Sequence, residues 1–121
     1  MERTYVPTHT ATIYVGSYDK DIKFAPTPEV MMKIAEEICQ EYVDAVGLCV
    51  TLTQTRFIYS NGNENGVAVG LINYPRFPST QAKIQEQAIE LASRLQMAFD
   101  QYRVSIVFPD QTVMLSRDGV I

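Results

Sequence analysis

Residues 48–74 have the sequence LCVTLTQTRFIYSNGNENGVAVGLINY. Two runs rich in β-branched and aromatic residues, 48–60 and 66–74, flank the segment NGNENG. Asn and Gly tolerate positive φ, so this segment predicts a tight turn and the two runs predict a β-hairpin. A change in apolar phase inside the first run also predicts a bulge or bend near residues 53–56.

A helix is predicted on each side of this hairpin. Residues 27–47 carry apolar side chains at helical spacing, begin with the capping residue Thr27 and end at Gly47. Residues 79–99 repeat the helical spacing, and Ser79 is the expected N-cap. Both segments therefore predict amphipathic helices that cover one face of a sheet.

Alternating apolar residues predict three further strands, at 8–18, 101–109 and 112–116. The order of elements is then β-α-β-β-α-β-β. This order favours an α+β fold with two helices on one face of an antiparallel sheet, in a ferredoxin-like or related arrangement. A chain of 121 residues with 46% hydrophobic and 20% charged residues is expected to form one folded domain over 1–121.

The net charge of −4 comes from one helix. The segment 27–47 holds five acidic residues and one lysine, while the acids and bases of the remaining residues balance. The overall charge excludes a broad DNA- or RNA-binding face, which would be basic. It does not exclude a compact anionic ligand held by two or three arginines, and this is the interpretation that the charge distribution favours.

The two cysteines, Cys39 and Cys49, lie in no metal-binding spacing, and Cys39 falls on the apolar stripe of a predicted helix. The N-terminal segment has no apolar leader run, and no apolar run approaches the ~18 residues that a membrane span needs. These features predict a reduced, cytoplasmic protein that does not interact with membranes.

The segment YPRFP at 74–78 is the first candidate binding site. It places Tyr74, Arg76 and Phe77 between and beside two prolines, which restrict the loop before a ligand binds. An aromatic ring can stack on a base, and an arginine can pair with phosphate. Arg103, at an outward position of a predicted strand, offers a second cation. The plainer interpretation is that Phe77 covers the edge of the core and Arg76 is solvated.

Two further features are weaker candidates. Asp118 follows the last strand, where it could accept a hydrogen bond from a ribose hydroxyl or an adenine amine, or form a salt bridge in the tail. The segment NGNENG joins two strands, so no helix N-terminus stands behind it and turn formation explains it better than phosphate binding.

Motifs of catalysis are missing from the sequence. His9 is the only histidine, and no nucleophile elbow, Cys–His pair, HExxH motif or DxD pair is present. The acidic residues Glu36, Glu37 and Glu41 lie along a solvated helix face. We therefore expect no catalytic residues, no metal and no cofactor, and the residues favour a binding protein over an enzyme.

Four stretches carry a resemblance to a known family: TATIYVG (10–16), FIYSNGNENG (57–66), GLINYPRFP (70–78) and QYRVSIV (101–107). Together they resemble the first type of phage Thoeris anti-defence sponge. The resemblance implies a cytoplasmic protein of the infected bacterial host that is not an enzyme. It would sequester cyclic ADP-ribose signals intact at an oligomer interface, and a separate site would hold cyclic trinucleotides.

The same resemblance assigns roles to individual residues. Phe77 would be the aromatic platform, Arg103 would contact the pyrophosphate, and Asp118 would contact ribose or base. Arg56, with the neighbouring loop, would hold the cyclic trinucleotide. A second pyrophosphate arginine is missing from the N-terminal strand, and a lysine, Lys20 or Lys23, would have to replace it.

Two other functions stand beside the sponge: a small phosphodiesterase that destroys the signal nucleotide, and a protein-interaction module. The first needs acid–base groups that the chain scarcely offers, and the second needs a docking face. More aromatic residues lie outside the predicted helices than one sheet face would bury. This surplus predicts a homo-oligomer, a homodimer or a hexamer built from dimers.

Overall fold

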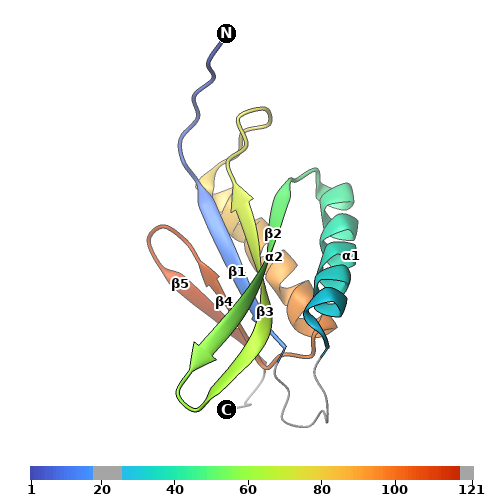
Figure 1. The fold of residues 1–121 in the computed structure, drawn as a ribbon. Coiled ribbons are helices and arrows are strands. Elements are labelled where there is room, and N and C mark those ends of the chain that lie inside the picture. Colours follow the sequence, from blue (N-terminus) through green and yellow to red (C-terminus); the bar gives the residue numbers. More distant parts are fainter. Residues whose placement is uncertain (18–25, 118–121) are drawn as a thin grey trace.

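The computed structural model describes residues 1–17 and 26–117 (Figure 1). Its elements are β1 (Thr10–Gly16), α1 (Pro28–Val46), β2 (Val50–Tyr59), β3 (Gly62–Ile72), α2 (Gln81–Ala98), β4 (Arg103–Val107) and β5 (Thr112–Ser116). This is the predicted order β-α-β-β-α-β-β, and the α+β class is confirmed.

The five strands form one antiparallel sheet in the order β2-β3-β1-β4-β5. The first strand, β1, lies in the middle of the sheet. The chain passes through α1 to the edge strand β2, and β3 then pairs between β2 and β1, which is a split β-α-β arrangement. The short strand β5 extends the opposite edge beside β4.

Both helices cover the same face of the sheet (Figure 1). Side chains along β1 alternate between the two faces of the sheet. Ala11, Ile13 and Val15 are fully buried in the core beneath the helices, whereas Tyr14 is exposed on the other face. The core is thus a single layer between sheet and helices. We call the other side the open face.

Local signals explain where the helices begin and end. The Thr27 hydroxyl accepts a hydrogen bond from the Val30 N–H at 3.2 Å, and Gly47 closes α1 with a φ of 74°.

The cap of α2 is Thr80 and not Ser79, because the Thr80 hydroxyl accepts from the Lys83 N–H at 3.1 Å. The Ser79 N–H donates instead to the Asn73 side chain.

The hairpin is tighter than predicted. Tyr59 pairs with Gly62, so the turn is only Ser60–Asn61, and Asn61 supplies a positive φ of 64°. The residues after the turn belong to β3. The predicted bulge near residues 53–56 is wrong, because the register runs without interruption from Val50↔Leu71 to Tyr59↔Gly62. The apolar phase changes because Phe57 faces the open side of the sheet.

Cys39 is buried and Cys49 is exposed, and both are unpaired. Burial raises the pKa of the Cys39 thiol to about 11, so this side chain is an inert part of the core. Neither helix in the described part of the chain combines the length and the hydropathy that a membrane span requires.

Candidate functional site

The centre of the open face is lined by very small residues. Gly66, Ala68 and Gly70 occupy successive open-face positions on β3, and Gly16 at the end of β1 pairs with Gly66. Larger side chains stand on the strands at either side. The glycines let Phe57 lie over Gly66 and Glu64 lie against Gly16. Beside these two side chains a hollow remains where β1 ends.

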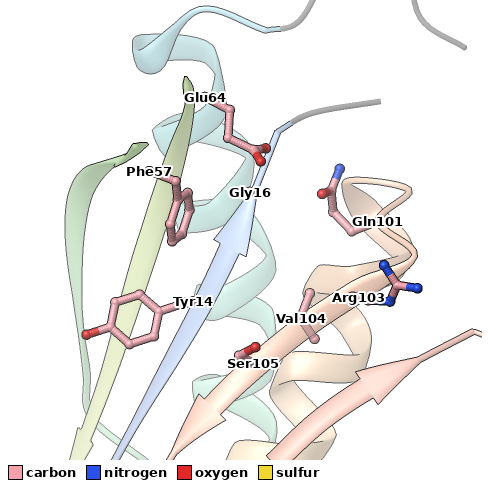
Figure 2. A pocket seen from close by; sticks show the side chains of 8 residues that line it. All are labelled: Tyr14, Gly16, Phe57, Glu64, Gln101, Arg103, Val104 and Ser105. Carbon is pink, nitrogen blue, oxygen red and sulfur yellow. The ribbon is translucent and has the colours of Figure 1, made fainter. Parts of the chain in front are cut away.

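This hollow forms a cavity of about 440 Å³ that is open to solvent on one side. We call it the sheet pocket. Its volume lies in the range of roughly 300–1,000 Å³ that is typical of small-molecule sites. The lining residues are Tyr14, Gly16, Phe57, Glu64, Gln101, Arg103, Val104 and Ser105 (Figure 2).

Glu64 is the carboxylate among these lining residues, and the neighbouring strand holds it in place. Its side chain extends from β3 toward Gly16 (Figure 2). The N–H of Ser17 donates to Glu64 Oε2 at 2.9 Å, and the Ser17 hydroxyl donates to the Asn65 carbonyl at 2.8 Å. Ser17 is itself buried, so these bonds tie the end of β1 to the start of β3.

Two aromatic rings form one wall of the pocket. The Phe57 ring lies over Gly66, in space that a side chain at that position would fill. Tyr14 meets Phe57 edge to face, with ring centroids 6.3 Å apart and an interplanar angle of 71°. Tyr14 and Phe57 therefore present both a ring face and a ring edge to a ligand.

Strand β4 supplies the opposite wall. Tyr14 pairs with Ser105 across β1 and β4, so the same register brings Arg103 beside Gly16. Arg103 is exposed, and its guanidinium has no hydrogen bond or ion pair with another described residue. Gln101, two residues before β4, is buried and donates to the Phe99 carbonyl at 3.0 Å.

This arrangement can recognise a ligand that carries both signs of charge and a flat ring. The carboxylate of Glu64 and the aromatic rings attract a cation, whereas Arg103 attracts a carboxylate or phosphate. Among residues 1–17 and 26–117, no group of three or more His, Cys, Asp or Glu side chains is placed to hold a metal ion.

Of the residues predicted from sequence, Arg103 lines the sheet pocket. Tyr74, Arg76 and Phe77 lie in the loop after β3, at the other end of the sheet. The two ends of the sheet lie six residues apart along β1, which corresponds to about 20 Å. Within one chain Phe77 and Arg103 therefore do not share a site. Tyr74 and Phe77 instead stack on each other, with ring centroids 4.9 Å apart.

Arg56 faces the helix side of the hairpin. Its guanidinium donates to the side-chain oxygens of Asn63 and Asn65, so it braces the hairpin rather than the sheet pocket. Asp118, Lys20 and Lys23 lie outside the described residues.

Sequence reasoning missed Glu64, Phe57 and Tyr14 as site residues. The Asn and Gly residues around Glu64 predict a longer loop than the one formed, and Glu64 would then lie in the turn. A single carboxylate also forms no cluster of acids that the sequence could reveal. The signal that was available is the pair Phe57 and Glu64, which become cross-strand neighbours once the two-residue turn is recognised.

No protein-family model matches the chain, and no curated protein matches it. Two solved structures are similar to it over its whole length. A phage SAM lyase in complex with S-methyl-5′-thioadenosine has a TM-score of 0.75 and 17% sequence identity, covering 100% of this chain and 98% of that chain. A phage SAM lyase in the apo state has a TM-score of 0.73 and 18% identity with the same coverage. At these identities the likeness establishes the fold that the chains share.

These structures overturn the resemblance to the Thoeris sponge family. Both are structures of a lyase, which is an enzyme, so the prediction of a non-catalytic sponge for cyclic ADP-ribose or cyclic trinucleotides is wrong. The comparisons favour neither alternative, the signal phosphodiesterase or the interaction module. The resemblance was carried by short strand and turn segments. Such segments recur in many antiparallel sheets because they satisfy backbone geometry and encode no ligand.

Proposed function

We propose that this protein is a SAM lyase, which breaks S-adenosylmethionine (SAM) and releases S-methyl-5′-thioadenosine. The observation that carries the proposal is the likeness, over the whole of both chains, to phage SAM lyase structures, one of which holds that compound. The sheet pocket gives separate support, because its charged groups and aromatic rings complement the charged groups and the adenine of SAM.

The reactive centre of SAM is a positively charged sulfur bonded to three carbons. Glu64 offers a negative charge, and Phe57 and Tyr14 offer ring surfaces that attract cations. The adenine of SAM is flat and can stack against the same aromatic wall. We assign Glu64 and Phe57 to the sulfonium, with Tyr14 completing the wall.

The reaction breaks the bond between sulfur and the amino-acid chain. The electron pair of this bond stays on sulfur, which becomes the neutral thioether of S-methyl-5′-thioadenosine. The carbon that is left takes an electron pair from within the amino-acid fragment. The donor is either the α-carboxylate, which closes a ring, or a neighbouring C–H bond, whose proton passes to solvent water.

Charge disappears from the sulfur as this bond breaks. A carboxylate near the sulfur therefore attracts the substrate more strongly than the transition state, and such a contact improves substrate binding rather than kcat. Glu64 acts as a binding residue in this scheme. The same holds for the rings of Phe57 and Tyr14, because their attraction for the charged sulfur also improves substrate binding rather than kcat.

The direct test is incubation of the purified protein with SAM, followed by chromatography and mass spectrometry of the products. We expect S-methyl-5′-thioadenosine to accumulate in proportion to protein concentration and well above the rate without protein. The heat-denatured protein and the double variant Phe57→Ala/Glu64→Gln are the controls. Accumulation at the protein-free rate would refute the proposal.

We also infer that the protein acts in the cytoplasm, as a single domain over 1–121 that binds no DNA or RNA. The exposed, unpaired Cys49 supports a reducing compartment. Fractionation of expressing cells tests the location.

A further inference from the structure

Four of the arginines in the folded domain fall into two groups. Three of them have a polar partner: Arg56 donates to two asparagines, Arg94 pairs with Glu90, and Arg117 pairs with Asp100. Arg94 and Arg117 also lie over the rings of Tyr42 and Tyr102. Arg103 has no such contact with another described residue, although it lines the sheet pocket.

The position of Arg103 makes the pocket bipolar. Glu64 Oε2 lies against Gly16 from the β3 side, and Arg103 lies beside Gly16 on the β4 side. Figure 2 shows the carboxylate and the guanidinium on opposite sides of the end of β1. No ion pair within 4.0 Å joins these two described residues, so neither neutralises the other.

The guanidinium of an arginine such as Arg103 is well suited to bind a carboxylate, because the two groups can form two parallel hydrogen bonds. Ser105 adds a hydroxyl on the same face of β4. In SAM the carboxylate is at the end of the amino-acid chain, a few bonds from the sulfonium. A ligand with its sulfonium at Glu64 would therefore direct its carboxylate across β1.

We propose that Arg103 is a specificity-determining residue that selects ligands by the free α-carboxylate of their amino-acid end. This inference rests on the proposed function, because it takes the adenosine derivative of an amino acid as the ligand. It adds a substrate rule: adenosine thioethers that lack the carboxylate bind without help from Arg103.

The test uses three stable ligands that differ in charge. Sinefungin carries an amine in place of the methylated sulfur and also has the carboxylate; S-adenosylhomocysteine has the carboxylate and a neutral sulfur; S-methyl-5′-thioadenosine has neither the cation nor the carboxylate. Their dissociation constants are measured by calorimetry for the native protein and for Arg103→Gln, Arg103→Lys and Arg76→Gln. Arg76 is the matched control, an exposed arginine at the other end of the sheet.

We expect Arg103→Gln to weaken the binding of sinefungin and S-adenosylhomocysteine about 10- to 100-fold, which is the usual effect of losing hydrogen bonds between charged groups. The dissociation constant of S-methyl-5′-thioadenosine should change less than about twofold. Arg103→Lys should recover part of the loss as a point charge, and Arg76→Gln should change none of the three.

Equal weakening of all three ligands by Arg103→Gln, or no weakening of any, would overturn the inference. Turnover of SAM is measured in parallel, so that the role of Arg103 and the proposed lyase activity are tested separately. The expected pattern without SAM cleavage supports Arg103 as a carboxylate-selecting residue and refutes the lyase. SAM cleavage with Kd values that Arg103→Gln leaves unchanged refutes only the role of Arg103. No binding of any ligand by the native protein refutes the inference.

Discussion

Glu64 Oε2 lies 2.5 Å from the point where a Cβ atom would stand on Gly16. The Ser17 N–H donates to the same oxygen at 2.9 Å. The carboxylate therefore occupies space that exists only because residue 16 has no side chain, and the next backbone amide orients it.

Gly16→Ala is expected to raise KM for SAM about three- to tenfold, with a smaller change in kcat, because the new methyl group displaces the carboxylate to which we assign the sulfonium. The free energy of unfolding should fall by less than about 1 kcal/mol, since only the end of a flexible side chain has to move. Steady-state kinetics and urea denaturation measure the two effects.

The matched control is Gly70→Ala, on the same face of the sheet. Its methyl group would meet the Thr51 hydroxyl, away from the sheet pocket. An equal rise in KM for both variants would show that Gly16 acts through the sheet and not through Glu64.

Phe57→Leu is expected to raise KM for SAM about 3- to 30-fold, because leucine keeps the apolar volume but loses the attraction between a ring face and a cation. Tyr74→Leu, a half-exposed aromatic at the other end of the sheet, should leave KM unchanged. Native kinetics in the Phe57→Leu variant would show that the Phe57 ring takes no part in the proposed binding of SAM.

Asn73→Ala is expected to destabilise the fold by about 2–3 kcal/mol. The buried Asn73 side chain donates to the Pro7 carbonyl at 2.7 Å and accepts from the Ser79 N–H at 2.6 Å. It thereby joins the N-terminal arm to the loop before α2. Gln40→Ala, which removes one exposed hydrogen bond to Asp44, should cost less than about 0.5 kcal/mol in the same urea titration.

Alkaline pH should weaken the fold through Tyr42. Burial, then the charge of Glu90 and the hydrogen bond to it, raise the pKa of Tyr42 from 10.0 to about 12. The folded state thus holds the phenolic proton more tightly than the unfolded chain does. The resulting stability is fully present below pH 10 and is lost as the pH rises to about 12.

The Tyr42→Phe variant should lose less stability than the native protein between pH 10 and pH 12, because it has no phenol to ionise. Tyr5→Phe, at an exposed position, is the control and should follow the native curve. Parallel curves for native protein and Tyr42→Phe would contradict the assignment.

The homo-oligomer remains a prediction, and the open face is where we expect its interface. Tyr14, Val107 and Met114 are exposed there. Light scattering should show a species larger than a monomer, and Met114→Lys should shift it toward monomer. Met97→Lys, on the exposed surface of α2, should leave the mass unchanged. A native monomer would refute the prediction.

Several elements of this fold are encoded within a few residues of sequence. Thr27 and Gly47 bound α1 through a side-chain cap and a left-handed residue, and both contacts are local. The alternation of β1 determines which residues meet the helices. The α+β class follows, because each helix and strand has its own periodicity and the hairpin makes its strands antiparallel.

The sheet pocket depends on contacts that no local pattern encodes. Glu64 meets Gly16 and Ser17, and Arg103 comes beside them from a strand almost 90 residues away along the chain from β1. A period of two determines the face of each residue but not which strand is its neighbour. That choice is made when β1 is inserted between β3 and β4 and the helices close over one side of the sheet. The sequence alone therefore determines the elements and their faces, whereas only the tertiary structure brings a carboxylate, two rings and an arginine around one pocket.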